Sequence, residues 1–131
     1  MHTCDGRDVS PPLRWEGAPP QTRSFTLILE DPDAPGGTFT HWVLFDIPVH
    51  HTGLPEALPV GRVGRSGITS FGRTGYKGPC PPGGVHRYVF ILYALSVPRL
   101  GLPEGSPRSS VERAMRSRVL AQARYMGRYG R

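Results

Sequence analysis

The sequence predicts a mainly β protein that forms one domain. Its 131 residues are an amount of chain that a single domain commonly contains. The 17 glycines and 15 prolines separate short apolar runs instead of filling long tracts. Three of these runs have the length and the β-branched or aromatic content of strands. No run approaches the roughly 20 apolar residues of a transmembrane helix, and a bundle of long helices does not fit so many turn residues.

The first two predicted strands follow a turn-rich segment that covers residues 1–23. Residues 24–30, with the sequence SFTLILE, form the first strand, and the turn residues 31–37 end it. Residues 40–47, with the sequence THWVLFDI, form the second. Alternation along this strand separates its side chains into one face with His41, Val43, Phe45 and Ile47 and another face with Trp42 and Leu44.

The third predicted strand covers residues 87–95 and follows a long irregular segment, residues 48–84, in which glycine recurs. A loop of this length in a compact domain is often functional. The strand is apolar on both faces, which is typical of an interior strand of a sheet. Its parity places four side chains on one side: His86, Tyr88, Phe90 and Leu92.

Helical periodicity is found near the end of the chain. Ser109 and Glu112 have the spacing of a capping box, with Ser109 as the N-cap and Glu112 at the third helical position. Apolar residues then recur at helical spacing at Val111, Ala114, Met115 and Val119. The pattern predicts a helix whose arginines, Arg113, Arg116 and Arg124, face the solvent.

The net charge of +6 comes entirely from the last quarter of the chain. Residues 1–98 contain eight basic and eight acidic side chains, whereas residues 99–131 contain eight arginines and two glutamates. A basic segment can attract anionic partners, but its simplest interpretation is the solvated face of an arginine-rich helix. We expect no nucleic-acid partner.

Cys4 and Cys80 make neither a disulfide framework nor a metal cluster, and the sequence leaves open whether they approach each other. The first residues lack the charged and apolar regions of a signal peptide, so we expect a cytoplasmic protein without integral membrane contact. The chain shows no P-loop, no nucleophile elbow and no metal-ligand spacing. We therefore expect no cofactor, no metal and no catalytic residues.

The residues with the strongest functional pattern are two histidines. His41 and His86 each begin a predicted strand directly after a loop rich in glycine and proline, where a rigid scaffold can present a side chain. Asp31 and Asp33 flank Pro32, and they either cap a turn or accept a hydrogen bond from a histidine or an ammonium group. The Gly/Pro-rich loop before His86 can direct backbone N–H groups at an anion.

These segments resemble the phosphatidylethanolamine-binding protein family, most closely its bacterial and archaeal branch, which is called Raf-kinase-inhibitor-like. The resemblance is carried by the motifs DPDAP at residues 31–35, HWV at 41–43, GPCPP at 78–82 and HRY at 86–88. Residues 3–6 and 10–13 resemble the family's early segment, and residues 112–129 resemble its terminal helix and its Gly-x-Tyr-Gly-Arg end. Residues 69–72 read Thr-Ser-Phe-Gly where Asn-Asp-Phe-Gly is usual.

The resemblance implies a β-sandwich of antiparallel strands with a short C-terminal helix. It also implies one domain over residues 1–131 whose N-terminal strand region is shortened. A small pocket for phosphate-like or carboxylate-like anions is expected, and the Ala34–Pro35 bond is a candidate cis peptide. By motif match, the ligand-binding residues are Asp31, Pro35, His41, Gly78, Pro81, His86 and Tyr88.

The function that fits best is non-enzymatic binding of a small anion, such as phosphate, a carboxylate or a phospho-head group. A second hypothesis is an inhibitor of a kinase or a serine protease that acts through its surface. A third is an enzyme that uses the same pocket for acid–base chemistry such as a cyclisation or an isomerisation. The sequence leaves a protein partner and a homodimer open.

Overall fold

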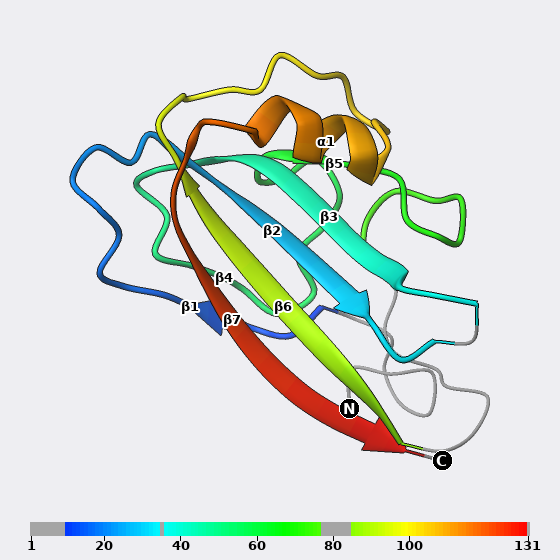
Figure 1. Cartoon of the computed structure of the whole chain (residues 1–131). Helices are drawn as coiled ribbons and strands as arrows, with labels where there is room; N and C mark the ends of the chain where they lie inside the picture. The colour runs from blue at the N-terminus through cyan, green and yellow to red at the C-terminus, as the bar shows by residue number, and fades with distance from the viewer. Residues whose placement is uncertain (1–9, 35, 77–84, 131) are drawn as a thin grey trace.

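The protein folds into two antiparallel sheets and one helix. The structure, a computed structural model, describes residues 10–34, 36–76 and 85–130 (Figure 1). The elements in chain order are β1 (Leu13–Arg14), β2 (Ser24–Asp31), β3 (Phe39–Pro48), β4 (Gly53–Leu54), β5 (Arg65–Ser66), β6 (Val85–Leu95), α1 (Arg108–Met115) and β7 (Val119–Gly130).

The larger sheet has the strand order β5-β3-β2-β6-β7, and the smaller sheet pairs β1 with β4. Each of these strand pairs is antiparallel. The prediction of a mainly β, antiparallel fold with one short helix is confirmed, and the three predicted strands match β2, β3 and β6 within two residues at each end. As predicted from its two apolar faces, β6 is an interior strand, between β2 and β7.

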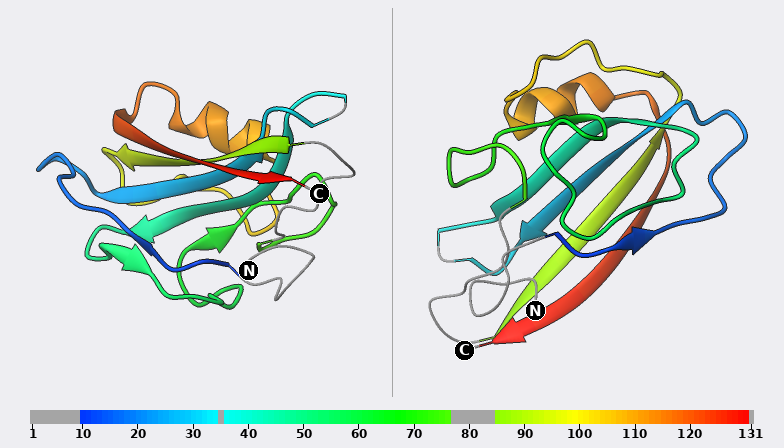
Figure 2. Two further views of the ribbon diagram at one scale, coloured as in Figure 1. Left: turned by 90° about the horizontal axis from the view of Figure 1, so that it is seen from below. Right: turned by 180° about the vertical axis from the view of Figure 1, so that it is seen from behind.

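The molecule has three layers, with the five-stranded sheet in the middle (Figure 2). On one face, the sheet packs against the segment that contains β1 and β4. The buried side chains between them form a first core cluster, which includes Phe25, Leu27, Leu29, Trp42, Leu44 and Leu54. On the other face the sheet packs against α1, and this second core cluster includes Ile28, Val43, Phe45, Val111 and Met115.

The helix begins differently from the prediction. Its N-cap residue is Pro107, which has an extended backbone and makes no side-chain capping hydrogen bond. Glu112 instead pairs with Arg108, one turn earlier, at 3.2 Å between Oε2 and Nε. The predicted capping box of Ser109 and Glu112 is therefore wrong, because Pro107 has already set the start of the helix and ion pairing takes the Glu112 side chain.

The helix also ends earlier than predicted, and the arginine-rich segment after it is a strand. Ser117 adopts φ 68°, and the Arg118 amide donates to the Met115 carbonyl at 2.9 Å, which closes the last turn. Residues 119–130 then pair with β6 along its whole length. The predicted continuation of the helix through Val119 to Arg124 is wrong, because backbone pairing along β6 outweighs helical spacing. Within the described residues, no helix is long and apolar enough to cross a bilayer.

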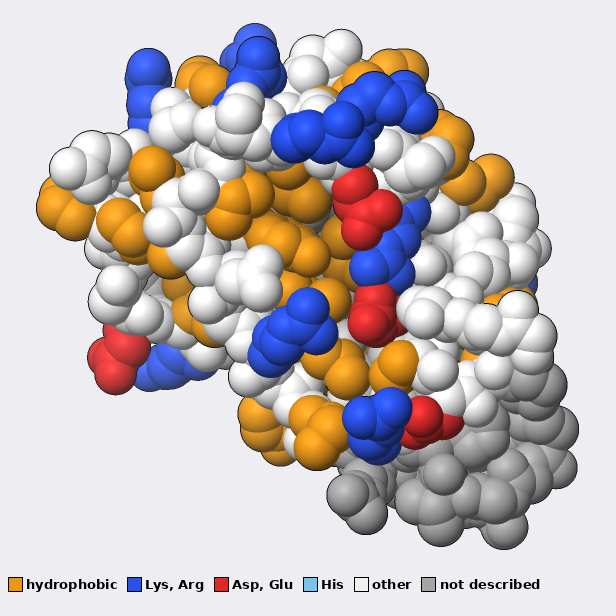
Figure 3. Space-filling view, viewed as in Figure 1, with side chains coloured by type: hydrophobic (Ala, Val, Ile, Leu, Met, Phe, Trp, Pro, Cys, Tyr) orange, Lys and Arg blue, Asp and Glu red, His pale blue; other side chains and the backbone are white. Residues whose placement is uncertain are grey.

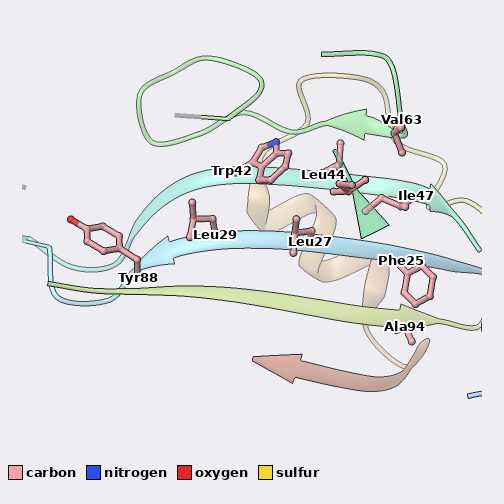
Figure 4. Packing of buried hydrophobic residues seen from close by; sticks show 10 residues of the cluster. Phe25, Leu27, Leu29, Trp42, Leu44, Ile47, Val63, Tyr88 and Ala94 are labelled. Carbon is pink, nitrogen blue, oxygen red and sulfur yellow. The ribbon is translucent and has the colours of Figure 1, made fainter. Parts of the chain in front are cut away.

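A bulge in β3 changes which face its last residues occupy. The register against β2 shifts between the Phe25–Ile47 pair and the Leu27–Leu44 pair, because β3 has one residue more than β2 there. Asp46 has φ 58° at this bulge. Ile47 therefore packs in the first core cluster beside Leu44, and its predicted place on the opposite face is wrong (Figure 4).

A second register shift affects a predicted site residue. Leu29 on β2 pairs with Trp42 on β3, and the next residue on β2, Glu30, pairs with Thr40. His41 is therefore an extra residue on β3 at this point. Its ring contacts Tyr88, which belongs to the same core cluster as Trp42. Strict alternation predicts His41 and Trp42 on opposite faces of the sheet. The shift in register explains why His41 instead contacts a residue of the same core cluster as Trp42.

Candidate functional site

The candidate site lies at one end of the five-stranded sheet. At this end β2 stops at Asp31, β3 starts at Phe39 and β6 starts at Val85. Asp31 is the register partner of Phe39, and Glu30 at the end of β2 is the partner of Val89 on β6. Antiparallel pairing thus brings three segments that are distant in sequence to the same edge.

His41 is enclosed by aromatic rings. Only 5% of its surface is exposed. Its ring centroid lies 5.1 Å from that of Phe39, 5.5 Å from that of Phe71 and 5.7 Å from that of Tyr88. Tyr88 is also 5% exposed, and its hydroxyl points away from the other labelled side chains of the first core cluster (Figure 4). The imidazole and the phenol are thus two hydrogen-bonding groups held by packing at the end of an apolar core.

Residues 69–72 hold Phe71 against His41. The Ser70 amide donates to the Thr40 carbonyl at 2.9 Å, and the Thr40 amide donates to the Ser70 hydroxyl at 2.8 Å. The Phe71 amide donates to the Thr69 hydroxyl at 3.1 Å. These bonds attach the segment to the start of β3, so the position of Phe71 follows from local hydrogen bonding as well as from ring packing.

The acidic turn after β2 is fixed by two different carboxylates. Asp31 is 3% exposed, and its Oδ1 accepts the Asp33 amide at 2.8 Å, which is the turn-capping role, one of the two roles that the sequence left open. Asp33 accepts two hydrogen bonds from the Arg87 guanidinium, at 2.9 and 2.8 Å, and one from the Arg87 amide at 2.9 Å. The bidentate pair connects the turn to the start of β6.

The electrostatic environment of Arg87 reflects this acidic turn. The hydrogen bonds to Asp33 and its negative charge raise the pKa of the Arg87 guanidinium, and the charge of Asp31 adds to the effect. Arg87 is therefore always charged and acts as a counter-ion for the turn.

A second arginine pairs with carboxylates on the helix side of the same end. Arg108 lies 2.6 Å from Glu30, and it donates to the Thr40 hydroxyl at 3.2 Å. On the face shown in Figure 3, acidic side chains lie beside basic ones in the same way. The charges at this end of the sheet are thus largely paired with each other.

The structure places three of the predicted site residues, Asp31, His41 and Tyr88, at the same end of the sheet, and the rings of His41 and Tyr88 are in contact. His86 lies on β6, where it is the register partner of Tyr129, but its side chain is outside the described part. The predicted positions that also fall outside the described residues are Pro35, Gly78 and Pro81, together with the Ala34–Pro35 bond, Cys4 and Cys80.

Sequence reasoning missed three residues that shape the site. Phe39 and Phe71 contact the His41 ring, and Arg87 anchors the acidic turn. Arg87 stands between His86 and Tyr88 in the HRY motif at residues 86–88, so its signal was present. Phe71 lies in the Thr-Ser-Phe-Gly stretch at residues 69–72, but its contact with His41 had no local signal, because it depends on the hydrogen bonds between residues 69–72 and Thr40.

A metal site is not evident in this part of the molecule. Among the described residues, no group of three or more His, Cys, Asp and Glu side chains is arranged to hold a metal ion. The arrangement that is present offers an imidazole, a phenol and a carboxylate next to a fixed turn, which suits recognition of a small polar group.

A comparison with protein families identifies the chain. The family model described as phosphatidylethanolamine-binding protein matches residues 1–130. The chain belongs to the phosphatidylethanolamine-binding protein family. This family membership confirms the resemblance found in the sequence motifs.

Relatives of known sequence cover nearly the whole chain. The UPF0098 protein of Aquifex aeolicus is 53% identical over an alignment of 136 positions that covers 100% of this chain and 80% of the relative. The UPF0098 protein of Methanothermobacter thermautotrophicus is 47% identical over an alignment of 134 positions that covers 99% of this chain and 88% of the relative.

Solved structures show the same fold. A phosphatidylethanolamine-binding protein homologue from Chlamydia trachomatis has a TM-score of 0.93 and 34% identity, with 99% of this chain and 86% of that chain covered. The Escherichia coli family member YbcL has a TM-score of 0.88 and 32% identity, with 98% and 84% covered. This member of the phosphatidylethanolamine-binding protein family therefore shares its whole fold with both.

Proposed function

We propose that this protein is a non-enzymatic binding module for a small anion, and that the anion binds at the end of β2, β3 and β6. The observation that carries the proposal is the enclosure of His41 by Phe39, Phe71 and Tyr88. A polar imidazole held by three rings is preorganised, because packing fixes its orientation before any ligand arrives.

The donors at this end fit a phosphate or a carboxylate. An imidazole N–H and a phenol O–H both donate to anionic oxygens, and such charge-assisted bonds are stronger than neutral ones. His41 and Tyr88 supply these two groups, and His86 lies on the same strand as Tyr88. The anion is a free phosphate, a carboxylate or the phosphate of a head group, since all three present negatively charged oxygens that accept hydrogen bonds.

Asp31 has a supporting role in this proposal. A carboxylate repels an anion, so it has to act through another group. Asp31 is buried at the same end as His41, and its pairing with the turn holds it in place. As an acceptor for a histidine N–H, it would fix the tautomer and the orientation of the imidazole that meets the ligand.

The test is a titration with sodium phosphate, sodium acetate and phosphoethanolamine, followed by thermal shift and calorimetry. Tyr88→Phe removes one buried hydroxyl, and Tyr125→Phe is the matched control because Tyr125 is 70% exposed on β7. His86→Ala tests the second histidine. We expect saturable binding to the wild type and to Tyr125→Phe, and binding about tenfold weaker in Tyr88→Phe and His86→Ala.

Two results would overturn the proposal. One is the absence of saturable binding of any of the three anions to the wild type. The other is wild-type affinity in both Tyr88→Phe and His86→Ala, which would place the bound anion elsewhere. Phosphoethanolamine that binds more tightly than phosphate would indicate a head group, and equal affinities would indicate that only the phosphate is recognised.

A further inference from the structure

The opposite end of the five-stranded sheet contains a hollow lined by arginines. At this end β2 begins and both β3 and β6 end, at the upper left of Figure 1. The hollow has a volume of about 500 Å³. Its lining includes Arg23 directly before β2, Arg65 from β5, Arg99 from beyond β6 and His50 from beyond β3. Three arginines from three separate parts of the chain thus line one hollow.

The three arginines are exposed, and the nearest acidic side chain in the lining, Asp46, interacts with Arg65 and Arg99 through its charge without forming an ion pair. Within the described part of the chain, none of Arg23, Arg65 and Arg99 forms an ion pair. Arg65 is held in place by a neutral group, since it donates to the Leu102 carbonyl at 3.1 Å. Like charges around one hollow repel each other, so an anion that enters it relieves this repulsion.

The walls of the hollow are fixed by the bulge in β3. Asp46, the residue with positive φ, directs its Oδ1 to the Leu100 amide at 2.9 Å and so holds the chain next to Arg99. Gly64 adopts φ 63°, and a Cβ there would lie 2.4 Å from the Phe45 carbonyl oxygen. The close approach of the chain at Gly64 to the Phe45 carbonyl of β3 therefore requires glycine.

Asp46 is the one acidic side chain among the described lining residues. Burial raises its pKa, while the Leu100 amide and the charges of Arg65 and Arg99 lower it. Three guanidinium groups and the one carboxylate, when it is ionised, together leave a net charge of about +2 in the hollow. The balance favours an anion with more than one charge.

We infer that this hollow is a second anion-binding site, and that it takes the di- or triphosphate group of a small molecule. A guanidinium binds phosphate oxygens in bidentate fashion, and three of them from different segments can contact successive phosphates. A hollow of this volume is within the range of small-molecule sites and is larger than one phosphate needs. This site lies at the opposite end of the sheet from the proposed His41 site. It is lined by exposed arginines, whereas the His41 ring is buried among aromatic rings.

The experiment compares two triple variants of equal charge. Arg23→Gln/Arg65→Gln/Arg99→Gln removes three positive charges from the hollow. Arg113→Gln/Arg116→Gln/Arg124→Gln removes three from exposed positions on α1, just after it and on β7. Sodium tripolyphosphate is titrated into each protein by calorimetry at an ionic strength of about 0.15 M, where long-range attraction is screened.

We expect saturable binding of tripolyphosphate to the wild type and to the control triple variant, and binding at least about tenfold weaker in the hollow variant. Equal losses in the two triple variants would show unspecific attraction to a basic protein and would overturn the inference. Orthophosphate that binds the hollow as tightly as tripolyphosphate would overturn the preference for several phosphates.

Two further measurements separate this site from the first and identify the ligand's source. Tyr88→Phe should keep wild-type affinity for tripolyphosphate, and a loss in this variant would place that ligand at the other end. ATP that binds more tightly than tripolyphosphate would indicate a nucleotide, and equal affinities would indicate that the phosphate chain alone is recognised. Either result is independent of whether orthophosphate binds at His41.

Discussion

At the end of the sheet where β2 stops, the closed end, aromatic rings bury His41 and the arginines form ion pairs with carboxylates. At the end where β2 begins, the open end, three arginines line a hollow and form no ion pair within the described residues. The two ends belong to the same three strands, β2, β3 and β6. If both proposed sites bind anions, packing and hydrogen bonds would select the ligand by its geometry at the closed end. At the open end net charge would select it, and the ligand itself would provide counter-charge for the arginines.

The largest difference between the ends should appear when one arginine is removed from each. Arg108→Met leaves Glu30, whose side chain is 12% exposed, without its partner at 2.6 Å. We expect the free energy of unfolding to fall by about 3 kcal/mol, because a buried charge is left unpaired. Arg99→Met should change it by less than about 0.5 kcal/mol. Urea denaturation measures both variants.

The double variant Glu30→Met/Arg108→Met provides the control for this comparison. It removes both charges, so most of the lost stability should return. If Arg108→Met and Arg99→Met have equal effects, the ion pair at the closed end contributes nothing and the contrast between the two ends fails.

A smaller difference is expected for the two histidines. His41→Ala removes a ring that contacts three others, and we expect a loss of about 2–3 kcal/mol in the free energy of unfolding. His50→Ala removes an exposed ring at the open end and should cost less than about 0.5 kcal/mol. Thermal unfolding of both variants checks the prediction. A His41→Ala protein as stable as the wild type would mean that the aromatic enclosure is not a rigid part of the fold.

The smallest effect concerns Asp46, at the open end. Burial raises its pKa in the folded state, so its charged form opposes folding above that pKa, and the penalty disappears as the pH falls below the unfolded value. Asp46→Asn keeps an oxygen for the Leu100 amide and tolerates the positive φ. The variant should melt at a higher temperature than the wild type at pH 7, and the difference should shrink at acidic pH.

Asp46→Asn also sharpens the comparison between the sites. It removes a negative charge from the arginine hollow, so tripolyphosphate should bind about two- to fivefold more tightly. Phosphate binding at the His41 end should not change. A decrease in tripolyphosphate affinity would contradict the electrostatic description of the hollow.

The main strands of the fold could be predicted because their signal is local. Residues 24–30, 40–47 and 87–95 each combine apolar side chains with turn residues at their ends, and all three form strands. The two bulges in β3 could not be predicted, since they depend on how many residues of β2 oppose them. The fate of residues 119–130 depended on β6 in the same way.

The candidate site was predicted in part for a similar reason. Asp31, His41 and Tyr88 lie at strand ends that antiparallel pairing brings together. Phe71 reaches His41 through a loop whose hydrogen bonds with Thr40 span about 30 residues of chain, and no local pattern encodes them. The arginine hollow draws on four segments, so the position of its charges emerged only with the fold.

The pairing of β6 with β7 has a consequence for how the protein is made. Translation produces β2, β3 and β6 first, and β7 follows only after α1. Until residues 119–130 leave the ribosome, the outer backbone edge of β6 has no partner, and an unpaired edge beside an apolar face can bind another chain. The nascent protein therefore passes through a stage that is prone to aggregation, and its last strand ends that stage.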